Sequence, residues 1–343
     1  MDGAMMREES ATRQMPEPEA VASPDGFTTI RMAFTAACNM NCFYCHNEGQ
    51  AADVTSRPRP IDLGQFDFAC QLLRANGLSV ANVTGGEFAM NQQWRDLLRI
   101  ARGRFADLVI TTNGSLLSEV DIDFIAQLGP SRFNISLDTA DPAAFAVVTR
   151  SPHHATVVST MARLFAVTGA EIVTNTVLLR NVNDTVEALR GIARLIHPYS
   201  RQVNIIKPHL NAHRPGFHPA GIEYYDAFVA EAKAASDSFA EKSYPDGSTN
   251  VKVMLDGVQF NFKNIYPRHD VAFCQGCQHV SRCTEWIIPP RFFVETGELA
   301  ACLLNRSKRL RLYGAEEDLE ANSAAARLLL ASAWSAIGEN ALG

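Results

Sequence analysis

The chain has 343 residues, of which 47% are hydrophobic and 20% are charged, and its net charge at pH 7 is -6. This composition suits a globular protein of two domains, or one large α/β unit with an appendage, and it allows a sizeable core. It excludes a nucleic-acid partner, because basic and acidic residues are mixed along the chain and form no stripe of lysine and arginine.

The first 25 residues are rich in Pro, Glu, Ala and Ser, and they predict a flexible leader. They contain no apolar signal-peptide core, and no apolar run in the chain approaches the roughly 18 to 20 residues that span a bilayer. We therefore expect a cytoplasmic protein with no membrane partner. Thiols stay reduced in the cytoplasm, so the eight cysteines predict metal ligands or catalytic groups rather than disulfides.

From Phe27 onward, strand-like segments alternate with helical patterns, which is typical of βα units around a parallel sheet. Six segments are predicted to be strands, namely residues 28–34, 78–84, 107–112, 132–138, 171–179 and 202–207. Apolar and polar side chains alternate in residues 132–138, so one face packs on helices and the polar face looks inward. The predicted fold class is α/β: a partial (β/α)6 TIM-like barrel over residues 26–240, with its site at the carboxyl ends of the strands.

Between the first two strands, residues 61–77 predict a helix that starts after Asp62 and stops at Gly77, with Cys70 in the core. Beyond residue 240 the βα pattern fades. Residues 250–262 predict a hairpin, and a cysteine-rich segment and a helix from about Leu319 follow it. We interpret residues 241–343 as a second, smaller module.

Cys38, Cys42 and Cys45 follow the first strand with the spacing C-x3-C-x2-C. One loop can wrap three thiolates around a cluster, but a 4Fe-4S cubane needs four ligands, so one iron is left for a ligand from outside the protein. A zinc site with His46 as fourth ligand is an alternative. The C-x-x-C-H pattern of c-type haem attachment belongs to exported proteins, and a thioredoxin-like pair leaves Cys38 unexplained.

The segment CNMNCFYC resembles the signature of radical S-adenosylmethionine (SAM) enzymes. Four further motifs follow in the order of that superfamily: TGGE (84–87), TTNG (111–114), NISLDT (134–139) and NTVLLRNVND (175–184). The resemblance implies that Cys38, Cys42 and Cys45 hold a 4Fe-4S cluster whose open iron chelates SAM. A 5'-deoxyadenosyl radical would then remove a hydrogen atom from the substrate, with an electron donor such as flavodoxin or ferredoxin as partner.

The same resemblance implies a set of SAM contacts. Gly85 and Gly86 would let the backbone approach the ligand, and Glu87 would offer a carboxylate to its ammonium group. The backbone around Tyr44 would contact adenine, and Ser136 would lie near the ribose. The implied cofactor-binding residues are Tyr44, Gly85, Gly86, Glu87, Ser136 and Asn175.

A second set of cysteines comprises Cys274, Cys277, Cys283 and Cys302. A zinc ribbon is one interpretation of such a set. In company with the first motif, the segment resembles the auxiliary modules of several radical SAM branches, which implies a second 4Fe-4S cluster. Four bound thiolates would make it an electron relay or acceptor, whereas three would leave an iron open to substrate; we favour four.

Among radical SAM branches, the chain from Thr28 onward resembles the molybdenum-cofactor GTP cyclase family. That likeness implies substrate contacts at Arg31 and Thr112, and Arg31 and Lys207 are candidate anion anchors. The chain departs from the family where Asn82 and Val173 replace an arginine and a lysine, and where Gln278 follows Cys277 in place of the first of two arginines. Each departure removes a cation that a triphosphate would use, so we do not expect GTP as the substrate.

Three functions follow from these patterns. The first is a radical SAM enzyme that cyclises, rearranges, epimerises or dehydrogenates a small metabolite, with phosphorylated and nucleoside-like compounds as the leading substrates. The second is the same chemistry on a ribosomally made peptide. Enzymes of that kind usually carry an N-terminal peptide-recognition domain, and the 25-residue leader is too short for one. The third is a non-catalytic zinc-binding interaction protein, for which the GGE motif has no use.

Overall fold

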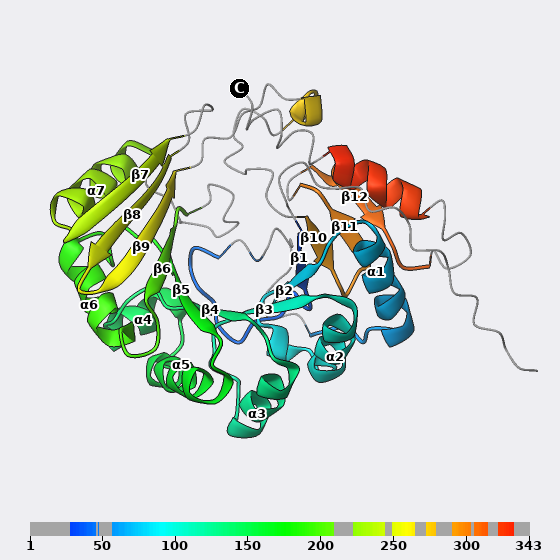
Figure 1. Cartoon of the computed structure of the whole chain (residues 1–343), viewed down its shortest axis with the longest axis horizontal. Helices are drawn as coiled ribbons and strands as arrows, with labels where there is room; N and C mark the ends of the chain where they lie inside the picture. The colour runs from blue at the N-terminus through cyan, green and yellow to red at the C-terminus, as the bar shows by residue number, and fades with distance from the viewer. Residues whose placement is uncertain are drawn as a thin grey trace, which may run out of the picture.

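The computed structural model describes residues 28–45, 47, 57–208, 222–243, 249–264, 272–278, 290–302, 305–314 and 322–332. Within these ranges one curved sheet of twelve strands forms the inner wall of a horseshoe, and helices cover its outer face (Figure 1). This mixed α/β architecture confirms the predicted partial TIM-like barrel. No helix in the described ranges is long and apolar enough to cross a bilayer.

All six predicted strands are present. They are β1 (Thr29–Ala33), β2 (Val80–Thr84), β3 (Asp107–Thr112), β4 (Arg132–Ser136), β5 (Glu171–Val177) and β6 (Gln202–Ile206). Each pairs in parallel with the next. The helices between and after them are α1 (Leu63–Ala75), α2 (Trp94–Arg104), α3 (Glu119–Leu128), α4 (Pro142–Thr149), α5 (His154–Thr168), α6 (Val186–Ile196) and α7 (Ile222–Ala234).

The strands after residue 236 extend the sheet at both of its ends. Beside β6 lie β9 (Val258–Asn264), β8 (Thr249–Leu255) and β7 (Ser238–Ser243); beside β1 lie β10 (Arg291–Phe293), β11 (Glu298–Ala300) and β12 (Arg309–Arg311). Both β9 and β10 run parallel to their inner neighbours. A division of the chain at residue 240 stays a prediction, but strands from both sides of that boundary share one sheet.

Local sequence signals account for several element ends. Helix α1 begins where the Asp62 carboxylate accepts hydrogen bonds from the backbone N–H groups of Gly64 and Gln65, as the N-cap prediction requires. The predicted hairpin is β8–β9, and its two-residue turn is Asp256–Gly257, both with positive φ. An Asp-Gly pair favours this turn because both residues tolerate that conformation.

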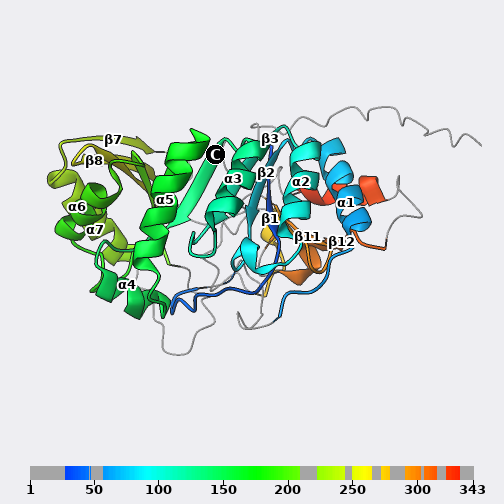
Figure 2. The ribbon, with the colours of Figure 1, turned by 90° about the horizontal axis from the view of Figure 1, so that it is seen from below.

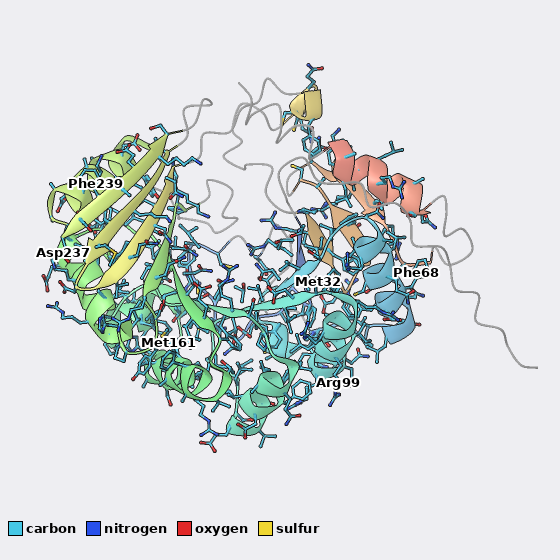
Figure 3. The ribbon with its side chains drawn as sticks, in the orientation of Figure 1. Met32, Phe68, Arg99, Met161, Asp237 and Phe239 are labelled. Carbon is cyan, nitrogen blue, oxygen red and sulfur yellow. The ribbon has the colours of Figure 1, made fainter. Side chains whose placement is uncertain are left out.

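The core lies between the sheet and the helices. Met32 on β1 and Met161 on α5 are fully buried there (Figure 3), and Cys70 is a buried core residue as predicted. In β4, Phe133 and Ile135 enter this core while Asn134 occupies the opposite, inner face. The alternation read from the sequence therefore leaves polar side chains on the inside of the horseshoe.

Candidate active site

Residues 38–45, here called the cysteine segment, come shortly after β1. The segment runs along one edge of the molecule towards α4, where Figure 2 shows it in dark blue. Its far end is fixed by α4: the backbone N–H groups of Asn41 and Phe43 donate to the carbonyl oxygens of Thr149 and Val148 (3.0 and 3.2 Å). Carbonyls in the last turn of a helix have no partner within the helix. The segment thus crosses the carboxyl ends of the strands between β1 and β4, which is the predicted location of the site.

The three thiols of this segment are partly buried and close enough to influence one another. Burial raises the pKa of Cys38 to about 12, and the neighbouring Glu87 and Cys45 add to the shift. Burial likewise raises the pKa of Cys42, with further contributions from Asp138 and the other two cysteines. Without a cation, these raised pKa values keep the Cys38 and Cys42 thiols protonated at neutral pH; a cationic iron centre would reverse that balance.

Backbone N–H groups are directed at two of the sulfurs. The N–H of Met40 lies 3.4 Å from the Cys38 Sγ, and that of Asn47 lies 3.3 Å from the Cys45 Sγ. Hydrogen bonds of this kind stabilise the thiolate form, in which cysteine ligates metal. The donor set therefore fits an iron–sulfur cluster, although the assignment of its ligands stays a prediction.

The TGGE turn packs directly against the start of the cysteine segment. Gly86 N donates to Thr35 O and Glu87 N donates to Ala37 O, both at 2.8 Å. A Cβ on Gly86 would lie 2.2 Å from Ala37 O, and one on Gly85, whose φ is +139°, would lie 2.5 Å from Thr35 O. Glycine is thus required at both positions because the two backbones touch there. This requirement is separate from the predicted approach of the glycine backbone to SAM.

Glu87 is 1% exposed, and its two carboxylate oxygens accept hydrogen bonds from the end of β3 and the residue that follows it. Thr112 Oγ1 donates to one oxygen and Asn113 N to the other, each at 2.7 Å. Burial raises the pKa of Glu87 to about 7, and these hydrogen bonds oppose the rise. The predicted contacts of Glu87 with SAM and of Thr112 with substrate remain predictions; the structure joins the two side chains to each other.

Asn113 connects this carboxylate network to a sulfur. Its Nδ2 lies 3.8 Å from Cys38 Sγ and donates to Asn39 Oδ1 at 3.0 Å, while its Oδ1 accepts from Ser115. Asn39 in turn donates to Ser115 Oγ at 2.7 Å. Asn113 stands in the TTNG motif (111–114) but had no predicted role, although that motif was the sequence signal that could have pointed to it.

Tyr44 contacts the carboxyl end of β4. Its hydroxyl donates to Asp138 Oδ2 at 2.6 Å, and Val177 N donates to Asp138 Oδ1 at 2.8 Å. Asp138 is buried, which raises its pKa to about 6 against the pull of those two bonds. Asp138 stands in the quoted NISLDT motif but was not singled out; here it links the cysteine segment to β5.

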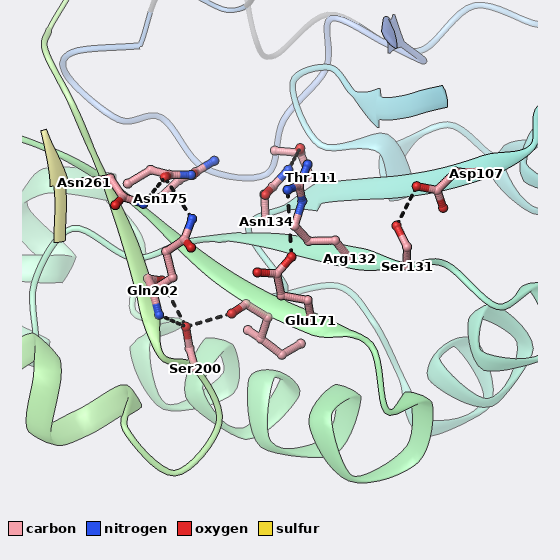
Figure 4. Close-up of polar contacts among 12 residues, drawn as sticks. Asp107, Thr111, Ser131, Arg132, Asn134, Glu171, Asn175, Ser200, Gln202 and Asn261 are labelled. Carbon is pink, nitrogen blue, oxygen red and sulfur yellow. Dashed lines mark hydrogen bonds and ion pairs between the residues drawn. The ribbon is translucent and has the colours of Figure 1, made fainter. Parts of the chain in front are cut away.

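A row of hydrogen-bonded asparagine side chains crosses β5, β6 and β9 on the inner face of the sheet. Asn175, Asn204 and Asn261 are in register on β5, β6 and β9. Asn204 Nδ2 donates to Asn175 Oδ1 (3.1 Å) and Asn261 Nδ2 donates to Asn204 Oδ1 (3.2 Å), as Figure 4 shows for part of the row. Ser136 pairs in register with Asn175, so two predicted cofactor contacts are neighbours.

The candidate anion anchors lie on different strands. Arg31 on β1 is in register with Asn82 on β2 and with Arg291 on β10, so two arginines stand side by side on the inner face. Lys207 follows β6, on the facing limb of the horseshoe, with its Nζ 5.5 Å from the centroid of the Tyr225 ring. Partial burial lowers the pKa of Lys207, and nearby Asp226 opposes that effect.

Three of the four C-terminal cysteines are described. Cys274 ends a 3-10 turn, η3 (Ala272–Cys274), and its carbonyl accepts from Cys277 N at 3.1 Å; Cys302 follows β11, and Asn305 N lies 3.5 Å from its Sγ. Cys283 lies outside the described residues, as does His46 of the zinc alternative. Within the described ranges, no three Cys, His, Asp or Glu side chains are placed to hold a single metal ion.

Comparison with known proteins agrees with this arrangement. A profile of the Radical SAM superfamily matches residues 32–195. The GTP 3',8-cyclase of Chlorobaculum tepidum is 32% identical over 157 residues, which are 45% of this chain and 46% of that protein. The probable GTP 3',8-cyclase of Pyrococcus abyssi is 24% identical over 297 residues, which are 84% of this chain and 88% of that protein.

Among solved structures, Streptococcus suis SuiB bound to S-adenosylmethionine superposes with a TM-score of 0.56 at 11% identity, covering 80% of this chain and 60% of that chain. Fold and cysteine segment define a class: partial α/β barrels that present three thiols at the carboxyl ends of their strands. The matched part of the chain, residues 32–195, is a radical SAM domain, and the cofactors of that superfamily are a 4Fe-4S cluster and SAM. The match spans about half the length of the Chlorobaculum relative.

Proposed function

We propose that the protein is a radical SAM enzyme in which Cys38, Cys42 and Cys45 hold the SAM-binding cluster. When bound, that cluster would supply the electron that cleaves SAM, and the resulting 5'-deoxyadenosyl radical would take hydrogen from the substrate. The observation that supports this best is the cysteine segment itself: three interacting thiols, with backbone N–H groups directed at Cys38 and Cys45.

The residues around the segment would bind and orient the cofactor. The backbone of Gly85 and Gly86, fixed against the cysteine segment, would present its polar groups to SAM. Tyr44, held by Asp138, and the neighbours Ser136 and Asn175 would face the nucleoside. The strands and their helices would keep water from the reacting carbon.

We further propose a small anionic metabolite as the substrate. Support comes from Arg31 and Arg291, which stand opposite each other on the adjacent strands β1 and β10. Arginine suits phosphate and carboxylate because its planar fork donates two parallel hydrogen bonds. The named relatives act on GTP, but Asn82 and Val173 stand where two cations of the resembled family are expected, so GTP enters the test as a comparison substrate.

A second cluster at Cys274, Cys277, Cys283 and Cys302 completes the proposal. Cys302 lies two residues after the end of β11, which continues the sheet beyond β1 and β10. That position would place an electron acceptor on the same limb as the first cysteine segment. A flavodoxin or ferredoxin would supply the electron that starts each turnover.

The test is anaerobic reconstitution with iron and sulfide, followed by reduction with dithionite in the presence of SAM. We expect about eight irons per chain for two 4Fe-4S clusters, and release of 5'-deoxyadenosine. Zinc without sulfide, or no 5'-deoxyadenosine with any reductant, would overturn the proposal. Phosphorylated metabolites, nucleotides including GTP, and peptides are then compared as substrates; stimulation by peptides alone would replace the small-metabolite assignment.

A further inference from the structure

We propose that Glu295, on the turn between β10 and β11, is a positioning residue that holds the chain before and after the cysteine segment. Its Oε1 accepts from Thr35 Oγ1 and from Arg59 N, both at 2.9 Å, and its Oε2 accepts from Ala36 N at 3.3 Å. Thr35 and Ala36 precede Cys38, whereas Arg59 lies where the chain returns towards α1. One carboxylate therefore joins three chain segments that are far apart in sequence.

The strand register explains how Glu295 reaches this place. Strand β10 is parallel to β1, with Phe293 opposite Ala33, and Val294 N donates to Ala33 O at 2.9 Å. Two residues beyond that pair, Glu295 and Thr35 are again level with each other. The turn then reverses at Gly297, where φ is +68° and a Cβ would lie 2.2 Å from the Tyr313 ring, so the carboxylate is held over the cysteine segment by a turn that only glycine permits.

Glu295 completes a grip on residues 35–37 from two sides. On one side the TGGE turn donates to the carbonyls of Thr35 and Ala37. On the other side Glu295 accepts from Thr35 and Ala36, and the Thr35 hydroxyl also accepts from Ala37 N at 3.1 Å. The last residue before Cys38 is thus fixed through its N–H as well as its C=O.

The contact with Arg59 extends the grip to the chain that returns towards α1 after the cysteine segment. Fixing both ends of a loop removes conformational freedom that the loop would otherwise keep. Since the anchor belongs to the β10–β11 turn, the C-terminal strands and the first cysteine set act as one unit. If the proposed function holds, anything that shifts β10 or β11 also shifts Cys38.

The first experiment needs no cluster and no activity. Amide hydrogen exchange is measured on the full metal-free chain for wild type, Glu295→Gln and Glu298→Gln. Glu298 is the matched control: it lies three residues further on, in β11, and its carboxylate pairs with Arg309 at 3.2 Å. We expect Glu295→Gln to speed exchange at Ala36 and Arg59 by at least tenfold, because the amide nitrogen that replaces one oxygen is a donor facing a donor. Equal exchange rates at Ala36 and Arg59 in both variants would overturn the proposal that Glu295 acts as a clamp on the chain around the cysteine segment.

Thr35→Val breaks the same hydrogen bond by removing the hydroxyl that donates to Glu295. It therefore tests the contact independently, in case Glu295→Gln misfolds for another reason. If the two side chains act together, the double variant will exchange at Ala37 no faster than the faster single variant. Fully additive effects would contradict the proposal.

The second experiment asks whether the clamp positions the cluster site. In reconstituted protein, the change in the electron paramagnetic resonance signal on adding SAM is compared for the same variants. We expect Glu298→Gln to keep this change and Glu295→Gln to lose at least half of it. An unaltered response in Glu295→Gln would reduce the residue to a structural contact. If wild type binds no iron, the proposed function fails while the exchange result still decides the clamp.

Discussion

The two cysteine sets differ in how the fold surrounds them. Cys38, Cys42 and Cys45 lie within one short segment that the TGGE turn, α4, Asp138 and Glu295 all fix in place. The second set is dispersed: among the described residues, Cys274 and Cys277 share one turn, and Cys302 lies 25 positions beyond Cys277. A compact segment with many anchors suits a site whose geometry must be ready before its ligand binds, whereas a dispersed set depends on the metal to bring its pieces together.

The largest expected effect separates the two sets by function. Cys42→Ala removes a proposed ligand of the SAM site, so 5'-deoxyadenosine formation should fall by more than about 100-fold, beyond the usual loss for a residue outside the ligand set. Cys277→Ala should still cleave SAM but fail to complete substrate conversion. Both are measured by anaerobic product analysis.

Cys70→Ala is the control for loss of a thiol, because Cys70 is a fully buried core residue of α1 that belongs to neither set. It should keep the iron content of wild type. If Cys42→Ala still formed 5'-deoxyadenosine, the assignment of Cys38, Cys42 and Cys45 as the ligands of the SAM-binding cluster would be wrong.

A second prediction tests the anchoring of the first set. Gly86→Ala places a Cβ 2.2 Å from Ala37 O, and backbone cannot move aside cheaply. We expect a loss of about 1–3 kcal/mol or more in the free energy of unfolding, measured by urea denaturation of the metal-free chain. Gly103→Ala, in α2 with open space around it, should instead gain roughly 0.5–1 kcal/mol. Equal effects at both glycines would mean that the TGGE turn does not bear on the cysteine segment.

Much of this architecture was readable from local sequence, and the rest depends on contacts that no local pattern records. The six strands, the cap at Asp62 and the burial of Cys70 follow from periodicity and capping chemistry, and each was predicted. The parallel pairing of β10 with β1 joins residues 260 positions apart, as in the register of Arg31 with Arg291. Glu295 could not be found from sequence, because its partners become neighbours only through that pairing.

A third prediction concerns pH and the buried acids beside the first set. Burial raises the pKa of Glu87 from 4.5 to about 7 and that of Asp138 from 3.8 to about 6. In the interval between the ordinary and the raised pKa, the folded chain keeps a proton that the unfolded chain has released. The metal-free protein should therefore lose stability as pH rises, from 4.5 to about 7 through Glu87 and from 3.8 to about 6 through Asp138. The loss is up to ~1.4 kcal/mol per pH unit for each acid within its own interval.

Unfolding by urea at several pH values measures this slope. Glu87→Gln should flatten it, because the group no longer titrates, whereas Glu119→Gln, an exposed carboxylate in the first turn of α3, should leave it unchanged. If stability still depends on pH to the same extent in Glu87→Gln, the proton that the folded chain retains belongs to Asp138 alone.

The smallest effect concerns the sulfur of Cys38 itself. Asn113 Nδ2 is 3.8 Å from that sulfur, and hydrogen bonds to cluster sulfurs favour the reduced, more negative state. Asn113→Ala should therefore lower the reduction potential of the SAM-site cluster, measured by a redox titration followed by electron paramagnetic resonance. Asn204→Ala removes an amide of the same kind from the opposite wall and should leave the potential unchanged. A potential that moves equally in both variants would indicate a general loosening of the barrel, and the distinction between an anchored and a dispersed cysteine set would then rest on Glu295 and the TGGE turn alone.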